Sequence, residues 1–344
     1  MSYTVTLKAS GKTFQAKPSQ TILEAASDAG ITIPYGCRSG MCGSCKGRLL
    51  SGDVMLEDYQ ESALTEQEKS DGLILCCKAL ATESITIEIR ESEEEEIIKS
   101  KVTPVRVESL EKLNKDVIKM MLKLPGDERL KFKAGQYIEF IMADNSRRAF
   151  SLANPPHQGL LELHLRLIEG GKFTQFVFNE MKEKSIHRID APIGQFYLRE
   201  SEKPIIFVAG GTGFAPVKSV IEDMIFTNIN RPIFLYRGVG KFEDLYMHDL
   251  SSEWANTLDE FTYIPVSQNQ SSNCDQLRIG LVHEAVLEDF ESLNNVQVYC
   301  CGAPGLVQIA FESFVVKGLP EDEFFADAFT FAPPKKLMHT DQMK

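Results

Sequence analysis

The sequence predicts a multidomain chain in which an α+β domain, an antiparallel β-barrel and a parallel α/β domain follow one another. Three observations support this order. Five of the eight cysteines crowd into residues 37–77. Residues 102–200 often alternate between apolar and polar side chains, whereas short apolar runs alternate with helical stretches from residue 204 onward. A length of 344 residues fits two or three domains at about 150 residues each.

The negative charge is concentrated near the N-terminus. The formal net charge is −12; residues 1–96 hold 16 acidic and 9 basic side chains, a balance of −7, which leaves −5 for the rest. An acidic domain disfavours nucleic acid and anionic membranes and fits a basic protein partner. The alternative is that the acidity only keeps the protein soluble.

The first five residues lack the basic region and apolar stretch of a signal peptide. The sequence also has no run of about 18 apolar residues that would span a membrane. We therefore expect a cytoplasmic protein without membrane insertion. In such a chain, clustered cysteines indicate metal binding rather than disulfides.

The first domain, residues 1–93, is expected to form a small mixed sheet. Alternation over 3–7 and again at 13–14 indicates two short strands around a glycine turn. Helix-forming residues at 21–26 predict a helix, and 85–89 alternate as a further strand.

An acidic linker is expected at residues 94–101. Residues 91–96 are almost all glutamate and have no apolar face. Like charges repel one another and extend a chain. The alternative is the start of a helix, because glutamate favours the first helical turn.

Cys37, Cys42 and Cys45 form a C-x4-C-x2-C pattern, the spacing of a plant-type [2Fe–2S] site that takes its fourth cysteine from further along the chain. That fourth ligand is Cys76 or Cys77. Each iron needs two thiolates, and the glycines of this loop let backbone amides approach the cluster. Structural zinc is the alternative, but it fits this spacing among glycines poorly.

Two further domains follow. Alternation over 137–141 and 161–166 suggests that residues 102–200 form an antiparallel barrel. In residues 201–344, apolar runs such as 205–209 alternate with helical stretches, which indicates a parallel sheet buried on both faces.

A glycine-rich turn follows the first apolar run of the third domain. It contains Gly211, Thr212, Gly213 and Pro216 and precedes a helical stretch at 217–224. Proline takes the place of the third glycine in the standard dinucleotide fingerprint. The strand–turn–helix context nevertheless favours a dinucleotide site over a mere tight turn.

Two segments of the second domain resemble the flavin motifs of the ferredoxin–NADP reductase superfamily. Arg148-Ala149-Phe150-Ser151 resembles R-x-Y-S, with phenylalanine for the usual tyrosine. The resemblance implies bound FAD, with Arg148 at the pyrophosphate, Phe150 on the ring face and Ser151 near N5. Gly170, Gly171, Lys172 and Thr174 match the G-G-x-x-[ST] loop, whose helix N-terminus cradles the pyrophosphate.

One strand upstream of that loop, His164 and Arg166 share a strand face. In the superfamily this strand borders the cofactor, so the resemblance implies that both residues do so. The alternative for His164 is a surface or packing role.

The third domain resembles the same superfamily, whose G-T-G-x-A-P turn binds NAD(P)H. Cys301 and Gly302 match its C-G-x-P segment, which places Cys301 beside the nicotinamide and flavin N5; an inert packed cysteine is the alternative. Asp327 and Phe329 lie where C-termini of the superfamily approach the flavin, although they fit core packing as well.

The coenzyme preference depends on the segment after the second strand of this domain. Arg237 and Lys241 are basic there, and no acid precedes Glu243. Relatives with Y-x-G at this point mostly use NADH, so we expect NADH, with NADPH not excluded.

The segment Leu75-Cys76-Cys77-Lys78-Ala79 resembles the L-x-C-x-A around the last ligand in ferredoxin domains of oxygenase reductases. This resemblance implies a β-grasp ferredoxin domain and makes Cys77 the fourth ligand, with Cys76 facing away. Ala81 and Ser84 depart from the proline and aspartate that this family usually has.

All three motif sets occur in order, so the resemblance spans nearly the whole chain. The stretches 261–266, 280–286 and 321–327 resemble the CDP-6-deoxy-delta-3,4-glucoseen reductase group of ferredoxin-fused reductases. The resemblance implies electron transfer from NAD(P)H through FAD and a [2Fe–2S] cluster to a partner protein, a deoxysugar dehydrase or oxygenase component. Alternatives are a redox carrier or sensor module and a free-standing flavin or dye reductase.

Overall fold

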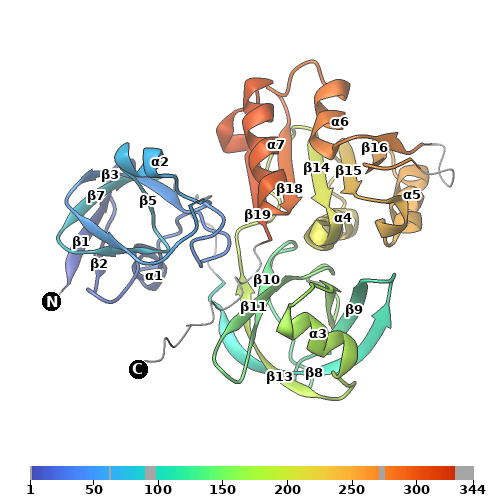
Figure 1. Cartoon of the computed structure of the whole chain (residues 1–344), viewed down its shortest axis with the longest axis horizontal. Helices are drawn as coiled ribbons and strands as arrows, with labels where there is room; N and C mark the ends of the chain where they lie inside the picture. The colour runs from blue at the N-terminus through green and yellow to red at the C-terminus, as the bar shows by residue number, and fades with distance from the viewer. Residues whose placement is uncertain (1, 62, 90–97, 271–275, 330–344) are drawn as a thin grey trace, which may run out of the picture.

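The protein, seen here as a computed structural model, is built from three units, each around its own sheet. The structure describes residues 2–61, 63–89, 98–270 and 276–329. In Figure 1 the N-terminal unit (blue) lies to the left, and the middle unit (green) lies below the C-terminal unit (yellow to red). The predicted multidomain α+β and α/β class is confirmed.

Two expectations concern the stretch between the first two units. The first half of the expected linker at 94–101, residues 94–97, lies outside the described residues. Lys101, which the prediction places in that linker, is the first residue of a strand. None of the helices in the described ranges has the length and apolar character needed to cross a bilayer.

The N-terminal unit has a mixed five-stranded sheet in the order β2-β1-β7-β3-β5, with β1 and β7 parallel. Its first helix begins with a capping box, because Thr21 accepts from the amide of Glu24 and Glu24 accepts from the amide of Thr21. A small β4–β6 ladder lies beside the sheet. The elements are β1 (Tyr3–Leu7), β2 (Thr13–Ala16), α1 (Ile22–Asp28), β3 (Lys46–Ser51), β4 (Val54–Leu56), α2 (Glu66–Ser70), β5 (Leu73–Leu75), β6 (Ala79–Ala81) and β7 (Ile85–Glu88).

The middle unit is an antiparallel sheet in the order β11-β10-β13-β8-β9-β12. A bridge between Leu152 and Leu163 joins the two outermost strands and closes the barrel. The alternating apolar residues point into one core. The elements are β8 (Lys101–Lys112), β9 (Val117–Lys123), β10 (Tyr137–Ile141), β11 (Arg147–Ser151), β12 (Leu161–Arg166), α3 (Lys172–Asn179) and β13 (Ile186–Ile193).

The C-terminal unit is a parallel sheet in the order β17-β16-β15-β14-β18-β19. Alternate residues of β14 enter separate apolar cores on the two faces, which explains its uninterrupted apolar run. The strand order reverses between β14 and β18, so ligands are expected at the carboxyl ends of these strands. The elements are β14 (Ile205–Gly210), η1 (Gly211–Gly213), α4 (Phe214–Thr227), β15 (Ile233–Val239), η2 (Phe242–Asp244), α5 (His248–Thr257), β16 (Phe261–Ser267), β17 (Arg278–Ile279), α6 (Val282–Asp289), β18 (Gln297–Gly302), α7 (Pro304–Val316), η3 (Glu321–Glu323) and β19 (Phe324–Ala328).

Candidate functional site

The four predicted cluster cysteines come together as two pairs. Three lie in the loop between α1 and β3, and Cys77 follows β5. The side chains of Cys37 and Cys42 hydrogen-bond to each other, as do those of Cys45 and Cys77. Among the described residues, no three potential ligands form a site for a single metal ion. Two thiol pairs fit a two-iron cluster, in which each iron takes two protein sulfurs.

Backbone amides surround these sulfurs. The amide of Met41 donates to Cys37 Sγ at 3.3 Å, and that of Cys77 donates to Cys45 Sγ at 3.4 Å. Cys76, by contrast, lies fully buried in the apolar core of the unit, where burial raises the pKa of its thiol to about 12. The structure therefore places the two neighbouring cysteines in different surroundings.

The two flavin segments lie side by side. Phe150 on β11 is edge-on to Phe140, with ring centroids 6.0 Å apart, and its ring lies 5.4 Å from that of Phe173 in the first turn of α3. The half-exposed Arg148 lies two residues before Phe150, and the exposed Lys172 directly precedes Phe173.

The loop before α3 is tightly closed. The hydroxyl of Thr174 donates to the carbonyl of Gly171 and accepts from the amide of Ile168, both at 3.1 Å. A Cβ at Gly171 would lie 2.8 Å from that hydroxyl, and Gly170 has a φ of +72°. The arrangement leaves the first amides of α3 free of a side-chain cap, as an anion site requires.

His164 and Arg166 have different surroundings on β12. His164 is buried, with its ring nitrogens 3.0 Å from the hydroxyl of Tyr246 and 2.8 Å from Glu162 Oε1, and burial lowers its pKa. Both nitrogens thus have protein partners, as the packing interpretation expects. Arg166 is exposed and reaches the glycine-rich turn, since its Nη1 lies 3.3 Å from where a Cβ on Gly211 would be.

The nicotinamide segments meet at the reversal point of the sheet. Residues 211–213 form η1 directly after β14, and a Cβ on Gly213 would lie 2.2 Å from the carbonyl oxygen of Cys301. Gly302 has a φ of +149° and packs against the backbone of Gly210. Pro216 is buried in the first turn of α4, where a helix does not need its amide hydrogen.

Ser151 of the barrel meets Cys301 and Asp327 of the C-terminal unit, and Cys37 of the N-terminal unit lies close enough to act on Asp327. The hydroxyl of Ser151 donates to Asp327 Oδ2 at 3.4 Å, and Cys301 pairs with Asp327 across β18 and β19. Burial, with a smaller contribution from the charge of nearby Cys37, raises the pKa of Asp327 to about 7 although the hydrogen bond from Ser151 lowers it. Burial also raises the pKa of the Cys301 thiol. Phe329 follows, its amide donating to the carbonyl of Gly302 at 2.7 Å.

Sequence reasoning missed the residues that connect the flavin strand to the nicotinamide helix. On α4, buried Lys218 donates to the carbonyl of Ala153 at 3.1 Å, and Ser219 donates to that of Asn154 at 2.6 Å. Their signal is two adjacent polar residues within an apolar stretch of the predicted helix. These two bonds hold the residues that follow Ser151 against the first turns of α4.

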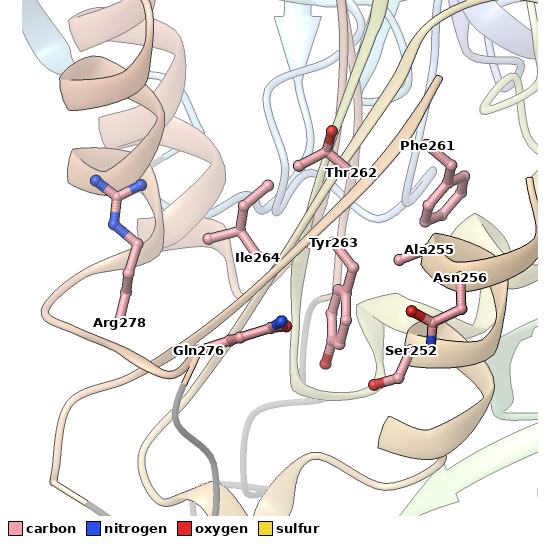
Figure 2. A pocket seen from close by; sticks show the side chains of 9 residues that line it. All are labelled: Ser252, Ala255, Asn256, Phe261, Thr262, Tyr263, Ile264, Gln276 and Arg278. Carbon is pink, nitrogen blue, oxygen red and sulfur yellow. The ribbon is translucent and has the colours of Figure 1, made fainter. Parts of the chain in front are cut away.

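A pocket of about 460 Å³ lies elsewhere in the C-terminal unit, between α5 and β16 (Figure 2). Tyr263, Asn256 and Gln276 line it, with Arg278 at one side (Figure 2). None of the predicted site residues lines this pocket.

Three protein-family models match the chain in the order of the three units. They are a 2Fe-2S iron-sulfur cluster binding domain over residues 5–82, an oxidoreductase FAD-binding domain over 104–197 and an oxidoreductase NAD-binding domain over 207–312. The predicted cofactors, a [2Fe–2S] cluster, FAD and a pyridine nucleotide, agree with these matches.

Curated proteins resemble the whole chain. It is 39% identical to the CDP-6-deoxy-L-threo-D-glycero-4-hexulose-3-dehydrase reductase of Yersinia pestis, over 96% of this chain and 99% of that one. It is 32% identical to reductase component 1 of terephthalate 1,2-dioxygenase from Comamonas, over 97% and 99%. Among solved structures, the Amycolatopsis reductase GcoB matches with a TM-score of 0.78 and 27% identity, over 95% and 98%.

Proposed function

This chain belongs to the family of ferredoxin-fused FAD- and NAD-binding reductases, and we propose that it passes electrons from NADH through FAD and a [2Fe–2S] cluster to a separate protein. Bound FAD supplies the conversion between the two-electron chemistry of NADH and the one-electron chemistry of the cluster. The protein binds the three cofactors, sets the distances between them and excludes water from the space between them.

The meeting of the three units at Asp327 carries this proposal. Ser151 comes from the flavin barrel, Cys301 from the nicotinamide sheet, and Cys37 from the cluster loop. The three cofactor motifs are far apart in the sequence, and their convergence beside one carboxylate is what a relay within one chain requires.

The roles of the individual residues follow from their positions. We assign the pairs Cys37/Cys42 and Cys45/Cys77 to the two irons, and Ser151 and Cys301 to the place where nicotinamide and flavin meet. We assign the other motif residues to holding FAD and the nucleotide: Arg148, Phe150, Arg166, Gly170, Gly171, Lys172, Thr174, Gly211, Thr212, Gly213, Pro216, Gly302 and Phe329. His164 supports this arrangement from the buried interface between the barrel and the C-terminal unit.

The preference for NADH is supported by the surroundings of Arg237. Its guanidinium is buried 3.6 Å from the ring centre of Phe214 and donates to the carbonyl of Tyr246 at 2.7 Å. It is therefore not free to bind a 2′-phosphate, and of Arg237 and Lys241 only the exposed Lys241, just after β15, faces solvent.

We propose a deoxysugar dehydrase as the acceptor, with an oxygenase component as the second candidate. The support is the 39% identity to a reductase named for a dehydrase, against 32% for one named for a dioxygenase. An acidic N-terminal domain fits a basic docking surface on either acceptor.

Deleting residues 1–96 tests the proposal, because the remaining units have cores of their own. A partner reductase would keep NADH-driven reduction of a dye and lose transfer to the protein acceptor. Transfer to that acceptor at the full-length rate would contradict the proposal and favour a free-standing dye reductase. Failure of the full chain to oxidise NADH would favour a carrier or sensor.

We also propose the domain limits 1–93, 101–200 and 201–344 with a linker at 94–100, because Lys101, which the sequence prediction puts in a linker at 94–101, begins β8. The family matches at 5–82, 104–197 and 207–312 fall inside these limits. A cytoplasmic location belongs to the same proposal, because the described cysteines are free thiols.

A further inference from the structure

The cluster loop and the flavin barrel are joined by hydrogen bonds at one place. The hydroxyl of Tyr137 donates to the carbonyl of Gly36 at 2.8 Å, and both groups are buried. The side-chain amide of Gln195 donates to the carbonyl of Ile33 at 2.9 Å. The amide of Gly194 donates to the hydroxyl of Tyr35 at 3.3 Å. On the ferredoxin side, these bonds all end within residues 33–36, immediately before Cys37.

On the barrel side, Tyr137 lies beside the flavin strand. It is the first residue of β10 and pairs directly with Ser151 on β11. Its aromatic ring packs against Gly194, where a Cβ would lie 2.7 Å from Tyr137 Cδ1. Tyr137 therefore links the two sites directly: its backbone pairs with Ser151, and its side chain reaches Gly36, the residue before Cys37.

We propose that Tyr137 is a positioning residue that docks the cluster loop against the flavin strand and so sets the rate of electron transfer between FAD and the [2Fe–2S] cluster. Gln195, which lies just after β13, docks the same loop through its bond to Ile33. This inference rests on the proposed function. The electron leaves reduced FAD and enters the cluster, and no bond of Tyr137 forms or breaks.

Gly194 helps to fix the orientation of the Tyr137 ring. Its φ of +100° and its contact with the Tyr137 ring leave no room for a larger residue. The ring is therefore held in one orientation, with its hydroxyl aimed at the carbonyl of Gly36. Because the tyrosine is only 4% exposed, water cannot readily replace the bond, and its loss leaves a buried carbonyl without its partner.

The test uses the full chain with both cofactors and compares three variants. Tyr137→Phe removes the hydroxyl beside the flavin strand. Gln195→Leu removes the bond to the carbonyl of Ile33, and Gln195 lies outside the flavin strand. Tyr236→Phe is the matched control, because it deletes another buried hydroxyl, which donates to Asp289 at 2.7 Å in the C-terminal unit. Anaerobic stopped-flow absorbance then follows flavin reduction by NADH and cluster reduction separately.

Tyr137→Phe and Gln195→Leu should slow cluster reduction while leaving flavin reduction by NADH unchanged. We expect about a tenfold effect for Tyr137→Phe, equivalent to ~1.4 kcal/mol. Amide hydrogen exchange should also become faster at residues 33–36 in both variants. Tyr236→Phe should alter neither rate.

Wild-type cluster reduction in both barrel variants would overturn the inference. So would slower flavin reduction in Tyr137→Phe with an unaffected Gln195→Leu, because Tyr137 would then act on the flavin itself. Failure of NADH to reduce the cluster of the unmodified protein would instead count against the proposed function.

Discussion

Cys76 and Cys77 are both buried in the core of their unit, but only Cys77 hydrogen-bonds the side chain of Cys45, as expected when successive side chains of an extended segment point to opposite sides. The residues alone left both as candidates for the fourth ligand, and a family resemblance separated them. Cys77 as the fourth ligand stays a prediction.

Cys77→Ser and Cys76→Ser test this assignment. Cys77→Ser should lose most of the cluster, because one iron would lack a thiolate. Cys76→Ser should keep the cluster and lose only some stability from its apolar site. Iron content and the visible spectrum of the purified variants measure the result. Cluster loss in Cys76→Ser with retention in Cys77→Ser would reverse the ligand assignment.

The raised pKa of Asp327 predicts that the stability of the fold depends on pH. Burial raises its pKa from 3.8 to about 7. The folded chain therefore keeps a proton that the unfolded chain releases from about pH 4 upward. The free energy of unfolding falls as the pH rises toward 7, and then levels off.

Asp327→Asn removes this dependence. Its stability advantage over the natural chain should grow from pH 5 to pH 8, toward a limit on the order of 4 kcal/mol. Thermal unfolding at the two pH values measures the difference, with the exposed Asp58→Asn as control. An advantage that is equal at both pH values would show that Asp327 ionises in the fold as it does in water.

At the scale of elements, the glycine-rich turn and the end of β18 interlock backbone against backbone. Local patterns predicted both segments, because apolar runs and glycine turns depend on residues close in sequence. The predicted helix at 217–224 lies within the longer α4, and the predicted strand at 85–89 corresponds to β7. The contact between Gly213 and Cys301 could not be predicted from nearby residues, because it depends on β18 lying next to β14 in the sheet.

Gly213→Ala tests that contact. The added methyl would overlap the carbonyl of Cys301, so the turn must shift away from β18. A displacement near 1 Å can cost about a hundredfold in rate, which we expect for flavin reduction by NADH. Gly305→Ala is the control, because a Cβ there meets nothing within 4 Å. Rapid-reaction absorbance compares them, and a wild-type rate in Gly213→Ala would exclude a tight requirement for this packing.

At the scale of the whole molecule, the order of the domains followed from the sequence, but their contacts did not. Tyr137 and Gly36 are 101 positions apart. Sequence patterns placed Tyr137 in an alternating strand and Gly36 in the cluster loop, but neither pattern predicts their contact. His164 and Arg237 looked available to cofactors, but the structure buries both against neighbouring side chains. Such contacts form only when separate domains meet, so local composition and spacing cannot reveal them.

The most direct test of the account is an anaerobic titration of the purified protein with NADH, followed by visible absorbance. We predict that both a flavin band and an iron–sulfur band bleach as NADH is added, because the proposed relay has all three cofactors close to Asp327. A protein that lacks either band, or whose flavin and cluster stay oxidised with both NADH and NADPH, would contradict the relay.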